Sequence, residues 1–398
     1  MLLLQNTVQR YAWGQTDGLS ALVGSEPSGG AEAELWVGAH PAAPSLVVDD
    51  PKGRTLDQVI AGDPSRWLGA ELVSRGTTEL PFLLKILAIG EPLSLQAHPS
   101  AEQAAVGFDR DDAAGIALDA PNRTYRDRSA KPESLVALVD TWAMCGFRSS
   151  EEFCALVDRL AVTALEPLSK LATTPEAAAL SEAFAWLLHV DPAERAVLSH
   201  AVSEAAAALA TDDPDDPFTW VRRLAQVYPD DPTILSPLLL NVICLEAGDA
   251  VHLPAGNLHA YLSGAGIEIM SASDNVLRGG LTPKHVDVDE LLDIVRFEPG
   301  LPIPPLRRQI APGITVFDSG EETFILAVID SAEAPVEIDP LGPSLLLAVG
   351  GEVDLAGPDR GLSIDGGAAV FVAPGEGPIV VSGPGRLWWA TVGDGVAC

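Results

Sequence analysis

The amino-acid sequence predicts a mainly β protein with an α-helical insertion. Residues 1 to about 148 contain short apolar runs broken by Gly, Pro and Asp, which is typical of short strands joined by turns. From residue 149 the chain is rich in Ala, Leu and Glu at helical spacing. From about residue 236 the short strand-like runs return and continue nearly to the end. These two changes in texture indicate a β–α–β order along the chain.

The first 148 residues are predicted to form strands such as those at residues 45–48 and 81–87. The run Pro-Leu-Ser-Leu-Gln-Ala-His-Pro at residues 92–99 also predicts a strand. Because side chains two apart in a strand share a face, Gln96 and His98 are expected to point the same way. A helix around residues 102–107 is expected to follow.

Helix start signals recur over about residues 149–228. Ser149 with Glu152 and Asp191 with Glu194 have the spacing of capping boxes. A capping residue precedes a proline at the first helical position three times, at Thr174, Asp191 and Asp216. Helices of this kind usually cover or wall a site.

The last part of the chain, from about residue 236, has the texture of a β-sandwich or barrel. Residues 248–254 (Gly-Asp-Ala-Val-His-Leu-Pro) are similar to residues 367–374 (Gly-Ala-Ala-Val-Phe-Val-Ala-Pro). A histidine follows the turn only in the first copy. The similarity suggests two barrels of common design, one with ligand residues and one without.

Composition limits the classes of function. The 398 residues are enough for two or three domains, and a net charge of −32 argues against a nucleic-acid partner. The amino terminus does not resemble a signal peptide, and no run reaches the ~20 apolar residues that span a bilayer. We therefore expect no membrane partner and a cytoplasmic location. The four cysteines lack paired spacing and are expected to be free thiols: Cys145, Cys154, Cys244 and Cys398.

The run at residues 248–259 carries the clearest chemical signal. It predicts a strand, a tight turn and a second strand that begins at His259. A single histidine in such a place is more often a packing residue. Together with Gln96, His98 and Glu133, however, His259 completes a set of four ligand-type residues, which predicts a metal site.

Lysine is rare in this chain, which has five, and three of them fall inside the motifs that suggest chemistry. These three are Lys85, Lys131 and Lys284. Their placement suggests binding of an anion, although each alone could be a solvated surface charge.

Seven ordered blocks give the chain its family resemblance. Residues 248–259 match the second metal-binding motif of cupins, except that Ser263 stands where the motif ends in Asn. More closely, the chain resembles type I phosphomannose isomerases over roughly residues 5–290, while the carboxy-terminal third matches only in β character. The blocks lie at residues 9–14, 34–41, 81–87, 92–99, 131–133, 254–261 and 273–284.

The resemblance implies two cupin-type (jelly-roll) β-barrels plus a helical domain. The catalytic cupin is expected to comprise residues 1–148 and 236–300. The helical domain is expected at 149–235 and a metal-free cupin-like β domain at 301–398.

The resemblance also implies one zinc ion per chain, held by Gln96, His98, Glu133 and His259. With one anionic ligand, such a site keeps a formal charge near +1 and stays electrophilic toward a substrate oxygen. The implied reaction interconverts mannose 6-phosphate and fructose 6-phosphate by proton transfer through an enediolate. The expected partner is therefore a phosphorylated hexose, bound by a chain that acts as a monomer.

Roles for further residues follow from the same blocks. Glu268 and Lys131 are alternative acid–base groups, and the residues do not decide between them. Arg278 is expected to contact the oxyanion or the substrate phosphate. The remaining substrate contacts are expected from Lys284, Lys85 and Ser94. His40 and His252 are expected to have structural roles.

One departure concerns the two residues before Lys131. Many family members carry Asn-His there, whereas this chain has Ser129 and Ala130. If that histidine assists ring opening or proton transfer, this chain must use another group or water. The substrate range therefore stays open.

Three alternatives remain at this point. The chain could isomerise another sugar or sugar phosphate, or bind sugar as a non-catalytic cupin. A cupin dioxygenase would prefer iron and more imidazole ligands, so Gln96 counts against it. No His-Glu-x-x-His run occurs, so a hydrolytic zinc enzyme is not expected.

Overall fold

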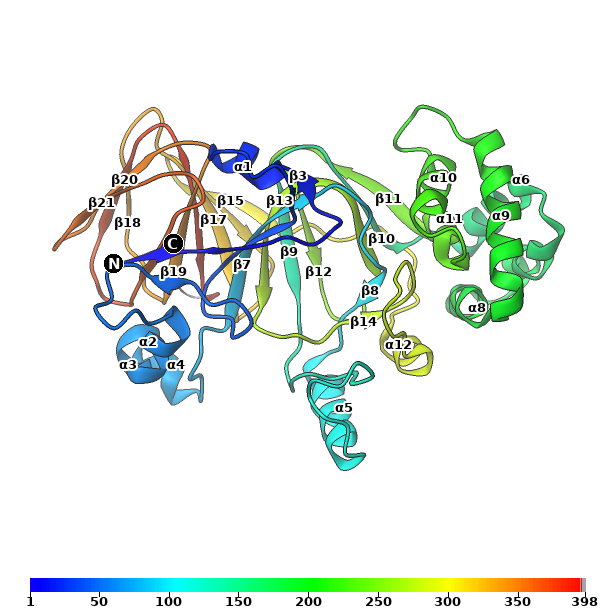
Figure 1. The fold of residues 1–398 in the computed structure, drawn as a ribbon, viewed down its shortest axis with the longest axis horizontal. Coiled ribbons are helices and arrows are strands. Elements are labelled where there is room, and N and C mark those ends of the chain that lie inside the picture. Colours follow the sequence, from blue (N-terminus) through cyan, green and yellow to red (C-terminus); the bar gives the residue numbers. More distant parts are fainter. Residues whose placement is uncertain (394, 396–398) are drawn as a thin grey trace.

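The computed structural model describes residues 1–393 and 395. It is rich in β-sheet and contains twelve α-helices within this part of the chain, which confirms the mainly β class with added helices. Two large antiparallel sheets lie side by side along the long axis, and most of the helices between residues 150 and 239 gather at one end (Figure 1).

The ten-stranded sheet is built around the long strand β13 (His259–Ser271). Its neighbours include β7 (Phe82–Ile89), β9 (Glu133–Ala137) and β10 (Thr141–Phe147). The other strands of this sheet are β2 (Thr7–Gln9), β5 (Glu34–Val37), β8 (Gln96–Ala97), β11 (Leu240–Leu245), β12 (Ala250–Leu253) and β14 (Leu277–Arg278).

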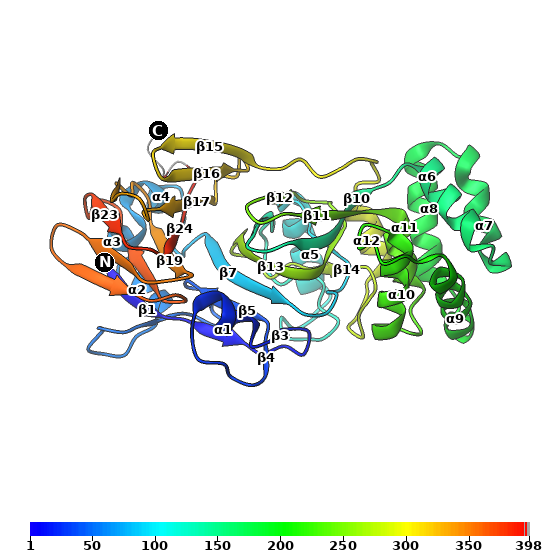
Figure 2. The same ribbon diagram turned by 90° about the horizontal axis from the view of Figure 1, so that it is seen from above.

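The eight-stranded sheet contains most of the carboxy-terminal strands, seen beside the first sheet in Figure 2. They are β15 (Leu306–Ala311), β16 (Ile314–Asp318), β17 (Ile325–Asp330), β19 (Ser344–Val349), β22 (Ala369–Val372) and β24 (Arg386–Thr391). A four-stranded sheet shares a hydrophobic core with it and comprises β18 (Val336–Ile338), β20 (Val353–Ala356), β21 (Gly361–Ile364) and β23 (Ile379–Ser382).

Two amino-terminal strands also belong to the eight-stranded sheet. β1 (Leu2–Gln5) pairs with β22 on one side and with β6 (Leu46–Val47) on the other. The first part of the chain therefore contributes strands to both large sheets. A separate two-stranded sheet is formed by β3 (Gln15–Thr16) and β4 (Ala31–Glu32).

The helical segment lies between β10 and β11 in sequence. Its α-helices are α6 (Ser150–Leu160), α7 (Glu166–Ser169), α8 (Glu176–His189), α9 (Pro192–Leu209), α10 (Pro217–Val227) and α11 (Ser236–Leu239). These helices share one hydrophobic core with the ten-stranded sheet. In this core Phe184 and Trp220 are buried together with Met144 of β10 and Leu262 of β13. The helices therefore close one end of the sheet that carries the predicted site.

The predicted helix starts are largely present. Ser149 and Glu152 form a capping box, and Asp216 accepts a hydrogen bond from the first turn of α10. Asp191 caps α9, but its carboxylate accepts a hydrogen bond from the backbone amide of Ala193. The capping box expected between Asp191 and Glu194 does not form. The prediction at Thr174 is wrong, because Pro175 occupies the capping position and α8 begins at Glu176.

Helices also occur where mainly strands were expected. α5 (Ala101–Ala113) starts at the Ser100–Gln103 capping box and runs beyond the predicted 102–107. Four short helices were not predicted: α1 (Gly18–Val23), α2 (Leu56–Gly62), α3 (Pro64–Leu68) and α4 (Ala70–Ser74). The last helix, α12 (Val288–Ile294), follows β14.

Two expectations about the chain as a whole can be compared with this fold. Cys145, Cys154 and Cys244 are free thiols, as predicted, and Cys398 lies outside the described residues. Within the described residues, no helix has the length and apolar character that crossing a bilayer requires.

Candidate metal centre and active site

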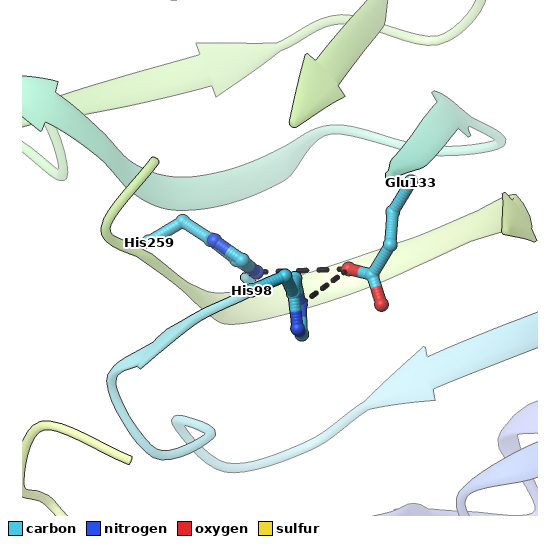
Figure 3. Close-up of side chains that lie close together, drawn as sticks. All are labelled: His98, Glu133 and His259. Atoms are coloured by element: carbon cyan, nitrogen blue, oxygen red, sulfur yellow. Dashed lines mark ion pairs between the residues drawn. The ribbon is translucent and has the colours of Figure 1, made fainter. Parts of the chain in front are cut away.

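Three buried side chains meet at one point: Glu133 of β9, His259 of β13, and His98, which directly follows β8 (Figure 3). Oε2 of Glu133 lies 3.4 Å from Nε2 of His98 and 3.6 Å from Nε2 of His259. Ligand atoms about 2.1 Å from a tetrahedral zinc ion lie roughly 3.4 Å from one another. The three side chains therefore already have the spacing of metal ligands.

Hydrogen bonds select the tautomer of both imidazoles. Nδ1 of His98 lies 2.8 Å from the carbonyl oxygen of Asn275, and Nδ1 of His259 lies 3.1 Å from that of Asn257. A carbonyl oxygen only accepts, so both Nδ1 atoms donate and both Nε2 atoms keep a lone pair in the neutral ring. Neither buried Nε2 has a hydrogen-bond partner among the described residues. Two unsatisfied lone pairs beside a buried carboxylate fit a cation.

Gln96 lies at the same place in the fold. It pairs with His259 across β8 and β13 and lines the cavity in front of Glu133. Its position as the fourth ligand remains a prediction.

Buried charges surround the three side chains. Lys131 forms an ion pair with Glu133, and Nζ of Lys85 lies 3.2 Å from Glu268 and 4.0 Å from Glu34. Burial alone would raise the pKa of Glu133, but the ammonium group of Lys131 outweighs it and holds that pKa well below its usual value. Glu133 is therefore an anion at neutral pH.

Glu268 and Lys85 titrate differently from Glu133. Burial raises the pKa of Glu268, and the nearby Glu133 adds to the rise although Lys85 opposes it. Burial would lower the pKa of Lys85, but the carboxylates of Glu34 and Glu268 outweigh it and raise that pKa. Lys85 is therefore a permanent cation, while Glu268 takes up a proton more readily than an exposed glutamate does.

A cavity of about 370 Å³ joins the predicted site residues. Besides Gln96 and Glu133, its walls include Ser94, Lys85, Lys131, Glu268, Arg278 and Lys284. A second cavity of about 930 Å³ shares Asp274, Arg278 and Lys284 with the first. The structure thus brings every residue predicted for catalysis or substrate binding to one hollow, with His98 and His259 directly behind Glu133.

Arg278 and Lys284 form the cationic side of this hollow. Neither side chain has an ion-pair partner among the residues that the structure describes. Burial lowers the pKa of both groups, and Arg278 lowers that of Lys284 further. Two partly buried cations without counter-ions favour the binding of an anion.

Tyr261 is a site residue that the sequence interpretation missed. It lines the cavity and is 2% exposed, and its hydroxyl has no partner among the described residues. Burial raises its pKa well above 10, so the phenol keeps its proton and can donate it in a hydrogen bond. Its position two residues after His259 on β13 was the available signal, since alternate strand residues share a face.

His40 and His252 also lie near the site. Nε2 of His40 is 3.3 Å from Asp274, and both residues line the cavity. Nδ1 of His252 lies 3.0 Å from the carbonyl oxygen of Glu133, and its Nε2 is 3.3 Å from Glu321. Both histidines contact groups that border the site and are not among the clustered ligand atoms.

Comparisons with known proteins give a consistent result. The family model for the catalytic domain of type I phosphomannose isomerase matches residues 1–150. A mannose-6-phosphate isomerase of Escherichia coli K12 is 38% identical over 390 residues, covering 97% of this chain and 98% of the relative. The human mannose-6-phosphate isomerase is 30% identical over 411 residues, covering 94% and 93%.

Solved structures show the same similarity. A crystal structure of mannose 6-phosphate isomerase with bound zinc and yttrium superposes with a TM-score of 0.90 at 34% identity. The superposition covers 98% of this chain and 99% of that one. A variant of phosphomannose isomerase from Salmonella typhimurium gives the same TM-score and coverage.

The buried site predicts a specific pH dependence of stability. Burial lowers the pKa of His98 to about 4 from 6.5. Between these values the unfolded chain binds more protons than the folded one, so the metal-free protein loses stability as the pH falls from 6.5 to 4. The loss from this histidine reaches up to about 3 kcal/mol. Urea unfolding of chelator-treated protein at about pH 7 and pH 4.5 measures it.

The control is His98→Gln, which should lack this part of the pH dependence. If wild-type protein and H98Q lost equal stability between the two pH values, burial of a neutral His98 would be refuted.

Proposed function

The chain belongs to the type I mannose-6-phosphate isomerase family, and we propose that its reaction takes place in the cavity in front of Glu133. The reaction is the zinc-dependent interconversion of mannose 6-phosphate and fructose 6-phosphate. The observation that carries this assignment is the pair of buried, unpartnered Nε2 atoms of His98 and His259 beside that carboxylate. The other isomerase substrates and the sugar-binding role left open by the sequence have no separate observation in their favour.

The proposed zinc ligands are His98, Glu133 and His259, with Gln96 as the fourth. Two histidines and one carboxylate also form the ligand set of non-haem iron oxygenases, so these residues alone do not select the metal. The zinc-bound structural neighbour and the isomerase relatives support zinc. When bound, zinc supplies a Lewis acid that polarises a substrate oxygen and stabilises negative charge on it.

The chemistry needs one acid–base group at the reacting carbons. Isomerisation moves a proton from carbon-2 to carbon-1 and another from the carbon-2 hydroxyl to the carbonyl oxygen, so no redox partner is needed. We assign the carbon-to-carbon transfer to Glu268, because its raised pKa suits both accepting and returning a proton. Lys131 is already paired with Glu133, which supports an electrostatic role for it.

The cationic side of the hollow would hold the phosphate. Arg278 and Lys284 lack counter-ions and lie where the two cavities meet, so we assign them to the phosphate or the developing oxyanion. Ser94 adds a hydroxyl to the same wall. The charge of Lys85 is already balanced by ion pairs with Glu268 and Glu34. Its proposed role is therefore to orient Glu268 and to stabilise negative charge beside the substrate.

The fold divides into parts that match this assignment. We propose that the ten-stranded sheet is the catalytic cupin barrel, assembled mainly from residues 1–148 and 236–300. Residues 149–235 would form a helical domain that walls it, and residues 301–398 a cupin-like barrel without ligands. The enzyme is proposed to act as a monomer, as the sequence interpretation expects.

Chelation is the direct test of function. Wild-type protein is expected to convert mannose 6-phosphate to fructose 6-phosphate, to lose this activity on chelation, and to regain it when zinc is restored. His259→Ala should not regain activity, whereas His200→Ala, at an exposed histidine, should behave as wild type. Folded, zinc-loaded protein that converts no mannose 6-phosphate would refute the proposal.

The identity of the acid–base group can be tested by two substitutions. Glu268→Gln should lower kcat by about 10²–10⁴-fold while zinc content stays at one per chain. Lys131→Met should leave zinc bound, because removing a cation beside Glu133 strengthens the attraction of the site for a divalent ion, and it should lower kcat less than E268Q does. Steady-state kinetics and metal analysis of both variants separate the two roles. An active E268Q beside a zinc-loaded but inactive K131M would reverse the assignment.

Tyr261→Phe should lower activity without lowering stability. Removing a hydroxyl that donates to the reacting oxygens should lower kcat by about 10- to 100-fold with little change in KM. Removing a buried hydroxyl without a protein partner should leave the free energy of unfolding unchanged or raise it. Kinetics and urea unfolding test both statements, and unchanged kcat in Y261F would rule out substrate contact.

A further inference from the structure

A buried amide beside the site is not used by the chemistry proposed above. Asn275 lies in the loop between β13 and β14, has 0% exposure and lines neither cavity. It sits between His98 and the turn at residues 126–130, which leads directly into Lys131 and Glu133.

The hydrogen bonds of the Asn275 side chain all go to that turn. Its Oδ1 accepts from the backbone amides of Arg126 (2.7 Å) and Asp127 (3.3 Å). Its Nδ2 donates to the backbone carbonyls of Asp127 and Ser129, each at 2.9 Å, and to the Asp127 carboxylate at 3.1 Å. A primary amide offers two donor hydrogens and two acceptor lone pairs, so this turn fills its capacity. No group of this side chain remains for a substrate.

Asp127, in the turn at residues 126–130, also bonds to the loop that carries Asn275. Its carboxylate accepts from the Ser273 hydroxyl at 2.9 Å and from the backbone amide of Asp274 at 2.8 Å. We call Asp127, Ser273 and Asn275 the clasp. It joins two loops that lie almost 150 residues apart in sequence, and neither loop can shift without breaking several partly buried hydrogen bonds.

The main chain of Asn275 links the clasp to the metal site. Its carbonyl oxygen accepts the Nδ1–H bond of His98 at 2.8 Å, which sets the tautomer and ring orientation of that residue. The same residue thus holds His98 through its backbone and the approach to Glu133 through its side chain. We propose that Asn275 is a positioning residue that keeps these two groups in the geometry that binds zinc. The inference rests on the proposed function.

The clasp also explains how the altered pair before Lys131 is accommodated. Among residues 126–130 it uses backbone groups of Arg126, Asp127 and Ser129 and the carboxylate of Asp127. The side chains of Ser129 and Ala130 take no part in it. Replacing the usual Asn-His pair therefore leaves the hold on Lys131 and Glu133 intact.

The inference is tested with Asn275→Ala and Asn275→Asp. The aspartate keeps acceptors for the amides of Arg126 and Asp127 but loses both donors and places a second carboxylate beside Asp127. Both variants should bind zinc about 10- to 100-fold more weakly in chelator competition. Their cobalt-substituted forms should show an altered visible spectrum, and kcat at saturating zinc should fall more than KM rises.

The matched control is Asn241→Ala. Asn241 also donates to three backbone carbonyls, those of Gly146, Phe147 and Gly300, but at the outer strand β11. N241A should lower the melting temperature and leave zinc affinity and the cobalt spectrum unchanged. If N275A does not fold, N275D is judged by the same criteria.

Two outcomes would overturn the inference. One is zinc affinity and a cobalt spectrum within twofold of wild type in the folded Asn275 variants. The other is an equal loss of zinc affinity in N241A, which would indicate general loosening. Failure of the proposed function is distinguishable, because it would appear as absence of zinc binding in the wild-type protein itself and would remove the inference with it.

Discussion

The register of strand β13 determines where every reacting group lies. This strand pairs with β10, β7, β9 and β8, which places Glu268 opposite Lys85 and His259 opposite Gln96. Ile267 and Ile269, both completely buried, alternate with Glu268 and pack in the core shared by the two large sheets. A shift of one residue would exchange the faces and put the carboxylate among apolar side chains. The alternation of apolar and acidic residues along β13 thus determines which face of the sheet carries Glu268.

The second constraint is charge compensation inside the cavity. Among the buried residues that line it, Glu34, Glu133 and Glu268 carry three formal negative charges and Lys85 and Lys131 two positive ones, leaving −1. Two exposed carboxylates, Glu91 and Asp274, line the cavity as well. A divalent cation changes the sum over the buried residues to +1, and the unpaired Arg278 and Lys284 lie on the same side. On a chain with a net charge of −32, this cavity is where the proposed function requires a doubly charged phosphate to be attracted. The ion pair with Lys131 keeps Glu133 ionised beside the two imidazoles.

Most of the candidate site was predicted from the resemblance of ordered sequence blocks to a known family, and local signals supported parts of it. The turn before His259, the alternation around Glu268 and the capping residue Ser149 depend on neighbours within a few positions. The short helices after Thr55 and Asp63 also had local signals, a capping box and an Asp-Pro start, which the interpretation overlooked. The unpartnered hydroxyl of Tyr261 and the contacts of Asn275 depend on chain segments far away in sequence. Such contacts leave no periodic pattern, so only the fold reveals them.

The place of β1 affects how the protein is made. Leu2–Gln5 are synthesised long before their partner Ala369–Val372, which lies more than 360 residues further along the chain. At about 5–20 residues per second, β1 waits for roughly 20–70 s before this edge is available. During that interval β1 can pair with β6, but its other edge stays open in the nascent chain and can join other strands. The eight-stranded sheet therefore closes only after β22 is made, and a chain that stops before β22 leaves this edge of β1 exposed.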